Sequence, residues 1–166
     1  AGVGLFGWGE YALRSSAVVA GTALLVALLP LRRIEGDRFV LTASLFCALS
    51  SSLVFYSRYA IHESLFLFAG AVLGVCLYGW ARTFAAGWIY GGAVALGVLI
   101  ATKETFIITL FCLGVAVFCV RDPRVLAAAL LQQRRHLFCA LLTTVTVTAL
   151  LFSGAVSYTH LTLPTI

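Results

Sequence analysis

FVLTASLFCALSSSLVFYSRYAIHESLFLFAGAVLGVCLYGW, residues 39–80, contains two uncharged runs separated by a short polar segment. The runs cover residues 39–55 and 65–80, and the segment between them, YSRYAIHES, holds an arginine, a histidine and a glutamate. About 20 apolar residues in a helix cross a hydrocarbon core of ~30 Å. The stretch therefore predicts two membrane helices joined by a segment that is either a turn or part of a site.

The composition of the whole chain also indicates a membrane protein. Hydrophobic residues make up 62% and charged residues 10% of the sequence, and the mean hydropathy is +1.07. Soluble domains carry roughly 25% charged residues. A soluble fold of 166 residues cannot bury that much apolar surface, so we expect an integral, multi-pass protein of the plasma membrane whose first partner is membrane lipid.

Apolar runs predict an all-α bundle of about six transmembrane spans. They lie near residues 11–31, 39–56, 64–80, 87–102, 105–120 and 137–155. The fourth and fifth runs are short, and we expect them to form a hairpin whose tip, Lys103-Glu104, stays below the membrane surface. Period-two alternation is lacking, so helices are favoured over strands.

The two ends of the chain suggest a piece of a longer protein. The sequence has no methionine, which indicates that Ala1 is not a natural start. Residues 157–166, SYTHLTLPTI, change composition abruptly and resemble a translated adapter sequence. We therefore expect one incomplete membrane region over residues 1–156 and a non-native tail over residues 157–166.

The basic residues predict an orientation. Eight of the eleven cations fall in alternate breaks between runs: Arg32, Arg33, Arg38, Arg82, Arg121, Arg124, Arg134 and Arg135. The positive-inside rule assigns these breaks to the cytoplasm. The segment 56–64 and Lys103 then face the extracytoplasmic side. The same pattern explains the net charge of +5 without a nucleic-acid partner, and residues 125–136 are expected to lie along the cytoplasmic interface.

Cysteine spacing gives no sign of a metal or disulfide framework. The five cysteines all lie inside apolar runs and follow no regular interval, so they are interpreted as small core hydrophobes. No metal ligands are predicted among them.

The outer charges occur in clusters that hold both signs. Glu10 lies one helical turn from Arg14, Arg58 lies close to His62 and Glu63, and Lys103 precedes Glu104. Each cluster ends an apolar run at the same predicted membrane face. Such charges are either ordinary interfacial residues or members of one site, since ionisable residues at membrane depth often mark a functional position.

The blocks around these residues resemble a known family. Residues 50–63, SSSLVFYSRYAIHE, and residues 101–105, ATKET, are similar to motifs of the type C membrane glycosyltransferases. This clan includes the dolichyl-phosphate-mannose protein mannosyltransferases and the bacterial lipid A arabinosyl and mannosyl transferases. Within it, the blocks are most like those of a prokaryotic subfamily labelled flippase-activity-associated. With GLFG at residues 4–7, the resemblance covers roughly residues 4–120.

The resemblance implies a reaction and roles. Enzymes of this clan move a sugar from a polyprenyl-phosphate donor to an extracytoplasmic acceptor. Glu63 would be the catalytic carboxylate present here, orienting an acceptor hydroxyl or holding a divalent cation. Substrate-binding roles would fall to Arg14, Arg58, His62, Lys103 and Glu104. The clan's main catalytic carboxylate lies in an earlier outer loop, which would precede Ala1, so the chain alone is expected to be inactive.

Two other readings remain open. Behind the glycosyltransferase, the alternatives are a flippase or transporter-associated protein and a non-catalytic polytopic subunit that keeps the fold. An acidic pair in an upstream outer loop would favour the enzyme. Neither the sugar and acceptor, nor the need for a metal, nor the oligomeric state follows from the sequence.

Overall fold

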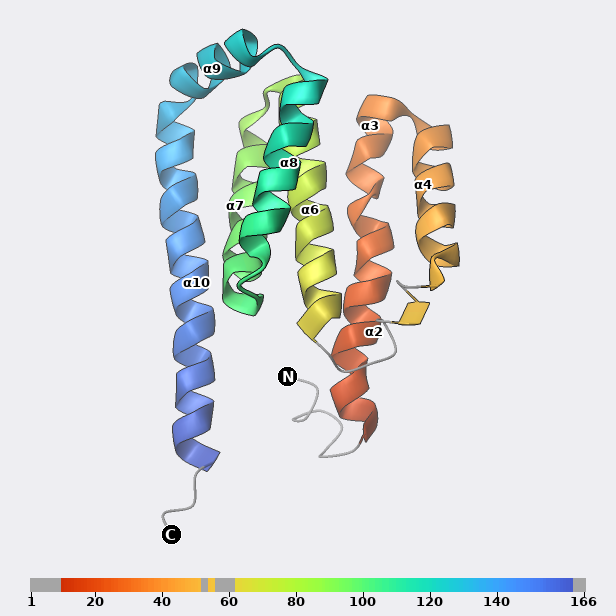
Figure 1. The fold of residues 1–166 in the computed structure, drawn as a ribbon, viewed down its shortest axis with the longest axis vertical. Coiled ribbons are helices and arrows are strands. Elements are labelled where there is room, and N and C mark those ends of the chain that lie inside the picture. Colours follow the sequence, from red (N-terminus) through yellow and green to blue (C-terminus); the bar gives the residue numbers. More distant parts are fainter. Residues whose placement is uncertain (1–9, 52–53, 56–61, 163–166) are drawn as a thin grey trace.

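A computed structural model of the chain describes residues 10–51, 54–55 and 62–162, with side chains over residues 17–51, 54–55 and 63–153. Within these ranges the regular structure is entirely helical, which confirms the predicted all-α class (Figure 1). The elements in chain order are α2 (Glu10–Ala27), η1 (Leu29–Leu31), α3 (Arg32–Glu35), α4 (Asp37–Leu49), α6 (His62–Thr83), α7 (Ala86–Thr102), α8 (Phe106–Val120), α9 (Pro123–Gln132) and α10 (Arg134–Thr162).

The number of membrane spans is smaller than predicted. Three stretches of the described chain are long and apolar enough to cross a membrane: Ala17–Glu35, Glu63–Thr83 and Arg134–Ser153. A fourth span results if α8 and α9, which meet at a bend of 108°, are counted together. The prediction of six was wrong because an apolar run does not reveal where its helix ends. Helix α4 has 13 residues and α7 has 17, which is about 20 and 26 Å at 1.5 Å per residue.

Helix α6 is the centre of the bundle, with α2, α7 and α8 packed against it and α10 packed against α7. The core between α6 and α7 contains Ala69, Leu73, Ala95 and Leu99, and Leu99 is only 1% exposed. Large apolar side chains on the outer helices are exposed instead, among them Phe111 at 71% and Leu131 at 75%. Such a surface suits lipid rather than water.

Helices α7 and α10 approach each other closely along a glycine. A β-carbon at Gly97 would lie 2.9 Å from Cβ of Val147 and 3.0 Å from the carbonyl oxygen of Thr144. At this short distance threonine hydroxyls reach across, since Thr144 Oγ1 donates to the Ala93 carbonyl at 3.0 Å and Thr148 Oγ1 to the Gly97 carbonyl at 3.2 Å. Small residues and interhelical hydroxyl bonds of this kind are how membrane helices associate without a hydrophobic driving force.

The cations gather at one end of the bundle, which we call the arginine-rich end. It comprises the α3–α4 turn, the α6–α7 connection and α9 with its flanks, and it holds the eight arginines that the charge pattern placed together (Figure 1). The start of α6 and the α7–α8 turn with Lys103 lie at the opposite end, the Lys103 end. The predicted grouping of the charges is confirmed, while its assignment to the cytoplasm stays a prediction.

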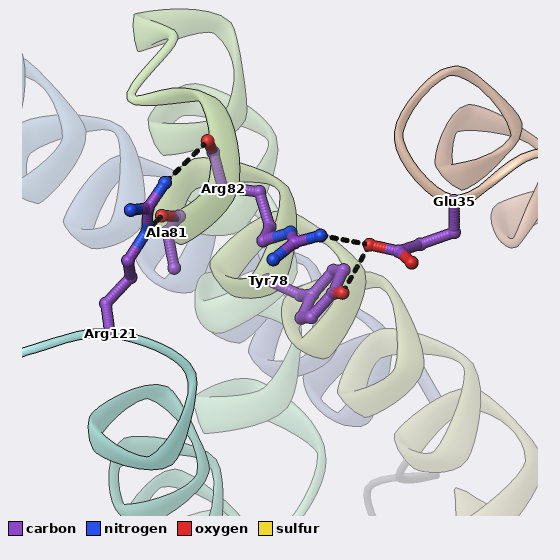
Figure 2. Close-up of polar contacts among 5 residues, drawn as sticks. All are labelled: Glu35, Tyr78, Ala81, Arg82 and Arg121. Atoms are coloured by element: carbon purple, nitrogen blue, oxygen red, sulfur yellow. Dashed lines mark hydrogen bonds and ion pairs between the residues drawn. The ribbon is translucent and has the colours of Figure 1, made fainter.

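Side chains at the arginine-rich end tie α6 to its neighbours on both sides (Figure 2). Glu35 of α3 accepts a hydrogen bond from the Tyr78 hydroxyl at 2.5 Å and pairs with Arg82 at 3.1 Å. From the other side, Arg121 donates to the carbonyls of Ala81 at 3.1 Å and Arg82 at 3.4 Å. The last carbonyls of a helix lack intrahelical donors, so Arg121 satisfies groups that would otherwise need water.

The turn between α3 and α4 is held by local contacts. Gly36 adopts a φ of 86°, a conformation that glycine tolerates without strain. Arg32 donates two hydrogen bonds to Asp37, one of them from Nη2 to Oδ2 at 2.9 Å. These bonds hold the pKa of the Asp37 carboxyl below its usual value. The turn is therefore closed by a charged clamp on the exposed side.

Helix α9 turns away from α8 and lies across the end of the bundle (Figure 1). Asp122 caps it by accepting a hydrogen bond from the Arg124 N–H at 2.8 Å, and Pro123 occupies its first turn. Leu126, 3% exposed, anchors it against Trp80 and Ala81. A helix thus occupies most of the predicted range 125–136 but ends at Gln132, because α10 already begins at Arg134; its position at a membrane interface stays a prediction.

Candidate functional site

Glu63 lies in the first turn of α6 at the Lys103 end. A carboxylate in this position interacts favourably with the positive end of the helix macrodipole. The next residue, Ser64, is buried at 5% exposure, while the Glu63 side chain is 32% exposed. Glu63 therefore stands at the boundary between the packed bundle and its surroundings.

Lys103 directly follows α7, where the chain leaves the helix. Its backbone is extended, with φ −159° and ψ 140°, and its N–H closes the last turn by donating to the Leu99 carbonyl at 3.3 Å. Thr102 Oγ1 bonds back to the Val98 and Leu99 carbonyls at 2.9 and 3.0 Å. A cation here also suits the negative end of the α7 dipole.

The antiparallel packing of α6 and α7 brings these two side chains together. Lys103 Nζ lies 3.0 Å from Glu63 Oε1, although 40 residues separate them in sequence. The lysine side chain is 43% exposed. A pair this exposed to water contributes only about 0–1 kcal/mol to stability. Loss of the pair therefore lowers the free energy of unfolding very little. The two side chains can serve binding instead of folding.

The remaining predicted site residues are placed less completely. Glu104 is exposed next to Lys103, and within the described part of the chain Lys103 pairs with Glu63 instead of Glu104. His62 is the first residue of α6, and Arg14 lies in α2, which begins at the same end of the bundle (Figure 1); the side chains of both lie outside the described ones. Arg58 lies outside the described residues altogether.

A mostly apolar cavity of about 240 Å³ opens between α2, α4 and α6. Ser64 lies in its wall, one residue from Glu63, and the other lining residues are Val18, Gly21, Thr22, Leu24, Leu25, Cys47, Ala48, Val54 and Leu67. The cavity lies where α4 ends at Leu49, and Val54, beyond that end, also lines it. Hydropathy marks no break inside residues 39–55, so this feature was not predicted.

The chemistry available at the Lys103 end is that of one cation and one carboxylate beside an apolar cavity. The ammonium group of Lys103 can bind an anionic oxygen, and the carboxylate of Glu63 can accept a hydrogen bond or a proton. No cluster of three His, Cys, Asp or Glu side chains suited to a metal occurs in the described ranges. A divalent cation held by Glu63 accordingly stays a hypothesis.

Comparisons of the chain with protein-family models, with curated proteins and with solved structures give no match.

Proposed function

We propose that the chain is the membrane region of a glycosyltransferase that takes its sugar from a polyprenyl-phosphate donor. The observation that carries this proposal is the 3.0 Å pairing of Lys103 with Glu63. Glu63 and Lys103 belong to the two sequence blocks that resemble the type C enzymes, and both lie at one end of the bundle. If the resemblance were due to chance, the two blocks would not be expected to contain residues that are in contact in the fold.

In the proposed reaction, the oxygen of an acceptor hydroxyl attacks the anomeric carbon of the donor sugar. The bond from that carbon to the phosphate oxygen breaks, and the polyprenyl phosphate leaves with the electron pair. Lys103 stabilises the negative charge that develops on the leaving phosphate, because its ammonium group is already held in place by Glu63 when that charge appears. Glu63 orients Lys103 before the donor binds and then orients the acceptor hydroxyl. The proton of that hydroxyl passes to a carboxylate, expected to be the one in the upstream loop.

The cavity between α2, α4 and α6 suits the hydrocarbon part of such a donor. Its walls are largely apolar, and Ser64 places it next to the charged pair. A donor with its prenyl chain in this cavity would hold its phosphate within reach of the Lys103 end. The cavity opens next to the C-terminal end of α4, at Leu49. The prenyl chain of the donor would enter the cavity there from the bilayer.

The experiment measures sugar transfer by the complete reading frame in membranes, with a panel of polyprenyl-phosphate sugars that carry a radiolabelled hexose or pentose. We expect Lys103→Ala to lower turnover by about 10²–10³, the usual effect of removing one such electrostatic contact. Arg33→Ala is the matched control, because Arg33 is an exposed cation at the opposite end.

A charge exchange separates binding from folding. The double variant Glu63→Lys with Lys103→Glu keeps an ion pair at the same place but puts each charge on the other helix. If the pair is only structural, the double variant restores the activity that either single variant loses. Restored activity, or near-normal turnover in Lys103→Ala, contradicts the proposal.

A further inference from the structure

A second cavity lies at the opposite end of the bundle, beneath α9. It measures about 320 Å³ and lies between α8 and α10, with α6 and α7 behind it. Its walls are almost entirely apolar, and they include Trp80 and Trp88, Leu130 of α9, and Leu137, Leu141 and Thr144 of α10. It shares no residue with the cavity beside Glu63. The proposed sugar transfer has no use for it.

Two arginines at the start of α10 precede the first cavity-lining residue of that helix, Leu137, and we call this end of the cavity its mouth. Arg134 lies one helical turn before Leu137, so it lies on the face of α10 that lines the cavity. Arg135 follows, and both are exposed. Among the side chains that the structure describes, none forms a hydrogen bond or ion pair with either guanidinium group.

Acidic groups do not balance these arginines. The sequence contains a single carboxylate side chain after Glu104, that of Asp122. That carboxylate is already engaged as the cap of α9, where it accepts the Arg124 N–H. His136 is occupied as well, because its Nδ1 lies 2.9 Å from the Tyr90 hydroxyl. Within the described part of the chain, the mouth of the cavity therefore offers two arginines without a side-chain partner next to an apolar wall.

We propose that this cavity binds one acyl chain of an anionic phospholipid, with the lipid phosphate held by Arg134 and Arg135. The argument is complementarity: an apolar slot accepts a hydrocarbon chain, and guanidinium groups bind phosphate through paired hydrogen bonds. The turn of 108° between α8 and α9 separates α8 from α10 at this end and leaves the slot beneath α9. A zwitterionic lipid would fit the slot but would not use the net positive charge at its mouth.

The two tryptophans in the cavity wall provide a direct test. Trp8→Phe leaves Trp80 and Trp88 as the only tryptophans of the chain. This variant, used as the full chain, is reconstituted in phosphatidylcholine vesicles that contain a minor fraction of lipid brominated on its acyl chains. Bromine quenches tryptophan fluorescence only at short range. Quenching by brominated phosphatidylglycerol is then compared with quenching by brominated phosphatidylcholine.

We expect phosphatidylglycerol to quench more strongly at equal fraction. Adding Arg134→Gln and Arg135→Gln should lower its relative binding constant by about fivefold per arginine, or about 25-fold in all. The matched control is Arg33→Gln with Arg38→Gln, which removes two exposed arginines from the same end of the bundle but from α3 and α4.

Each other outcome overturns the proposal. Equal quenching by the two lipids means that the slot takes any acyl chain without regard to headgroup. Absence of quenching by both means that protein, not lipid, fills it. An equal loss in the Arg33 and Arg38 control means that general surface charge, and not this mouth, attracts the lipid.

Discussion

Replacing Gly97 with alanine tests whether the close approach of α7 and α10 holds the bundle together. The added β-carbon would lie 2.9 Å from Cβ of Val147 and 3.0 Å from the Thr144 carbonyl oxygen. Neither atom is the far end of a flexible side chain, so the contact cannot be relieved by a rotamer change. The two helices have to separate by some tenths of an ångström, and Lys103, at the end of α7, would move with its helix.

The expected cost follows from these contacts. Overpacking a well-packed contact costs about 1–3 kcal/mol. Separation also weakens the hydroxyl bonds from Thr144 and Thr148 to α7, each worth about 0.6 kcal/mol in a membrane protein. Alanine regains about 0.5–1 kcal/mol of helix propensity over glycine. We therefore expect Gly97→Ala to lower the free energy of unfolding by about 1–3 kcal/mol.

The assay is reversible unfolding in mixed micelles of rising dodecyl sulfate content, followed by circular dichroism. Gly114→Ala in α8 is the matched control, because a β-carbon there meets no atom within 4 Å. The control should be neutral or slightly stabilising. If Gly97→Ala is as stable as Gly114→Ala, the close α7–α10 contact does not exist as described.

Thr144→Val should cost about 0.6–1.7 kcal/mol in the same unfolding assay, because Thr144 bonds across to α7; Thr146→Val, whose hydroxyl bonds only within α10, should cost less, and equal losses would contradict the reasoning. Gln133→Leu removes the acceptor of the Trp80 indole N–H and should cost about 1–3 kcal/mol, with a shifted tryptophan emission maximum; unchanged emission and stability would refute this. Lys103→Ala should change the unfolding free energy by less than about 1 kcal/mol, so a larger loss would show that the pair is structural.

The helices themselves could be predicted from the sequence, but their lengths could not. The run over residues 39–55 has no charge, proline or glycine to mark an end, yet α4 stops at Leu49 and Ser50 has an extended ψ of 111°. Three consecutive serines begin there, and serine side chains compete with helical backbone bonds. That signal was present but weak beside the hydropathy. The end of α8 at Arg121-Asp122-Pro123 was predictable, since proline cannot continue a helix with a normal hydrogen bond.

For the candidate site, the sequence predicted which residues share an end but not which of them touch. Charge clusters at the ends of apolar runs indicated that Glu63 and Lys103 lie at one membrane face. Their pairing depends on how far α6 and α7 slide along each other, which the core of Ala69, Leu73 and Leu99 determines. Local sequence instead favoured Glu104 as the partner of Lys103. Long-range packing decided between the two carboxylates, and hydropathy carries no information about it.

The unequal lengths of neighbouring helices have a consequence for the bilayer itself. Helix α7 has 17 residues and α10 has 29, or about 26 and 44 Å at 1.5 Å per residue. Both helices begin at the arginine-rich end, and α10 continues well past the α7–α8 turn (Figure 1). The part of α10 that is apolar enough to cross a membrane, Arg134–Ser153, is about 30 Å long and matches the hydrocarbon core, whereas α7 falls short of it. In a bilayer, a helix as short as α7 would favour thinning of the lipid leaflet around Lys103, which would bring headgroups and water toward the Lys103–Glu63 pair.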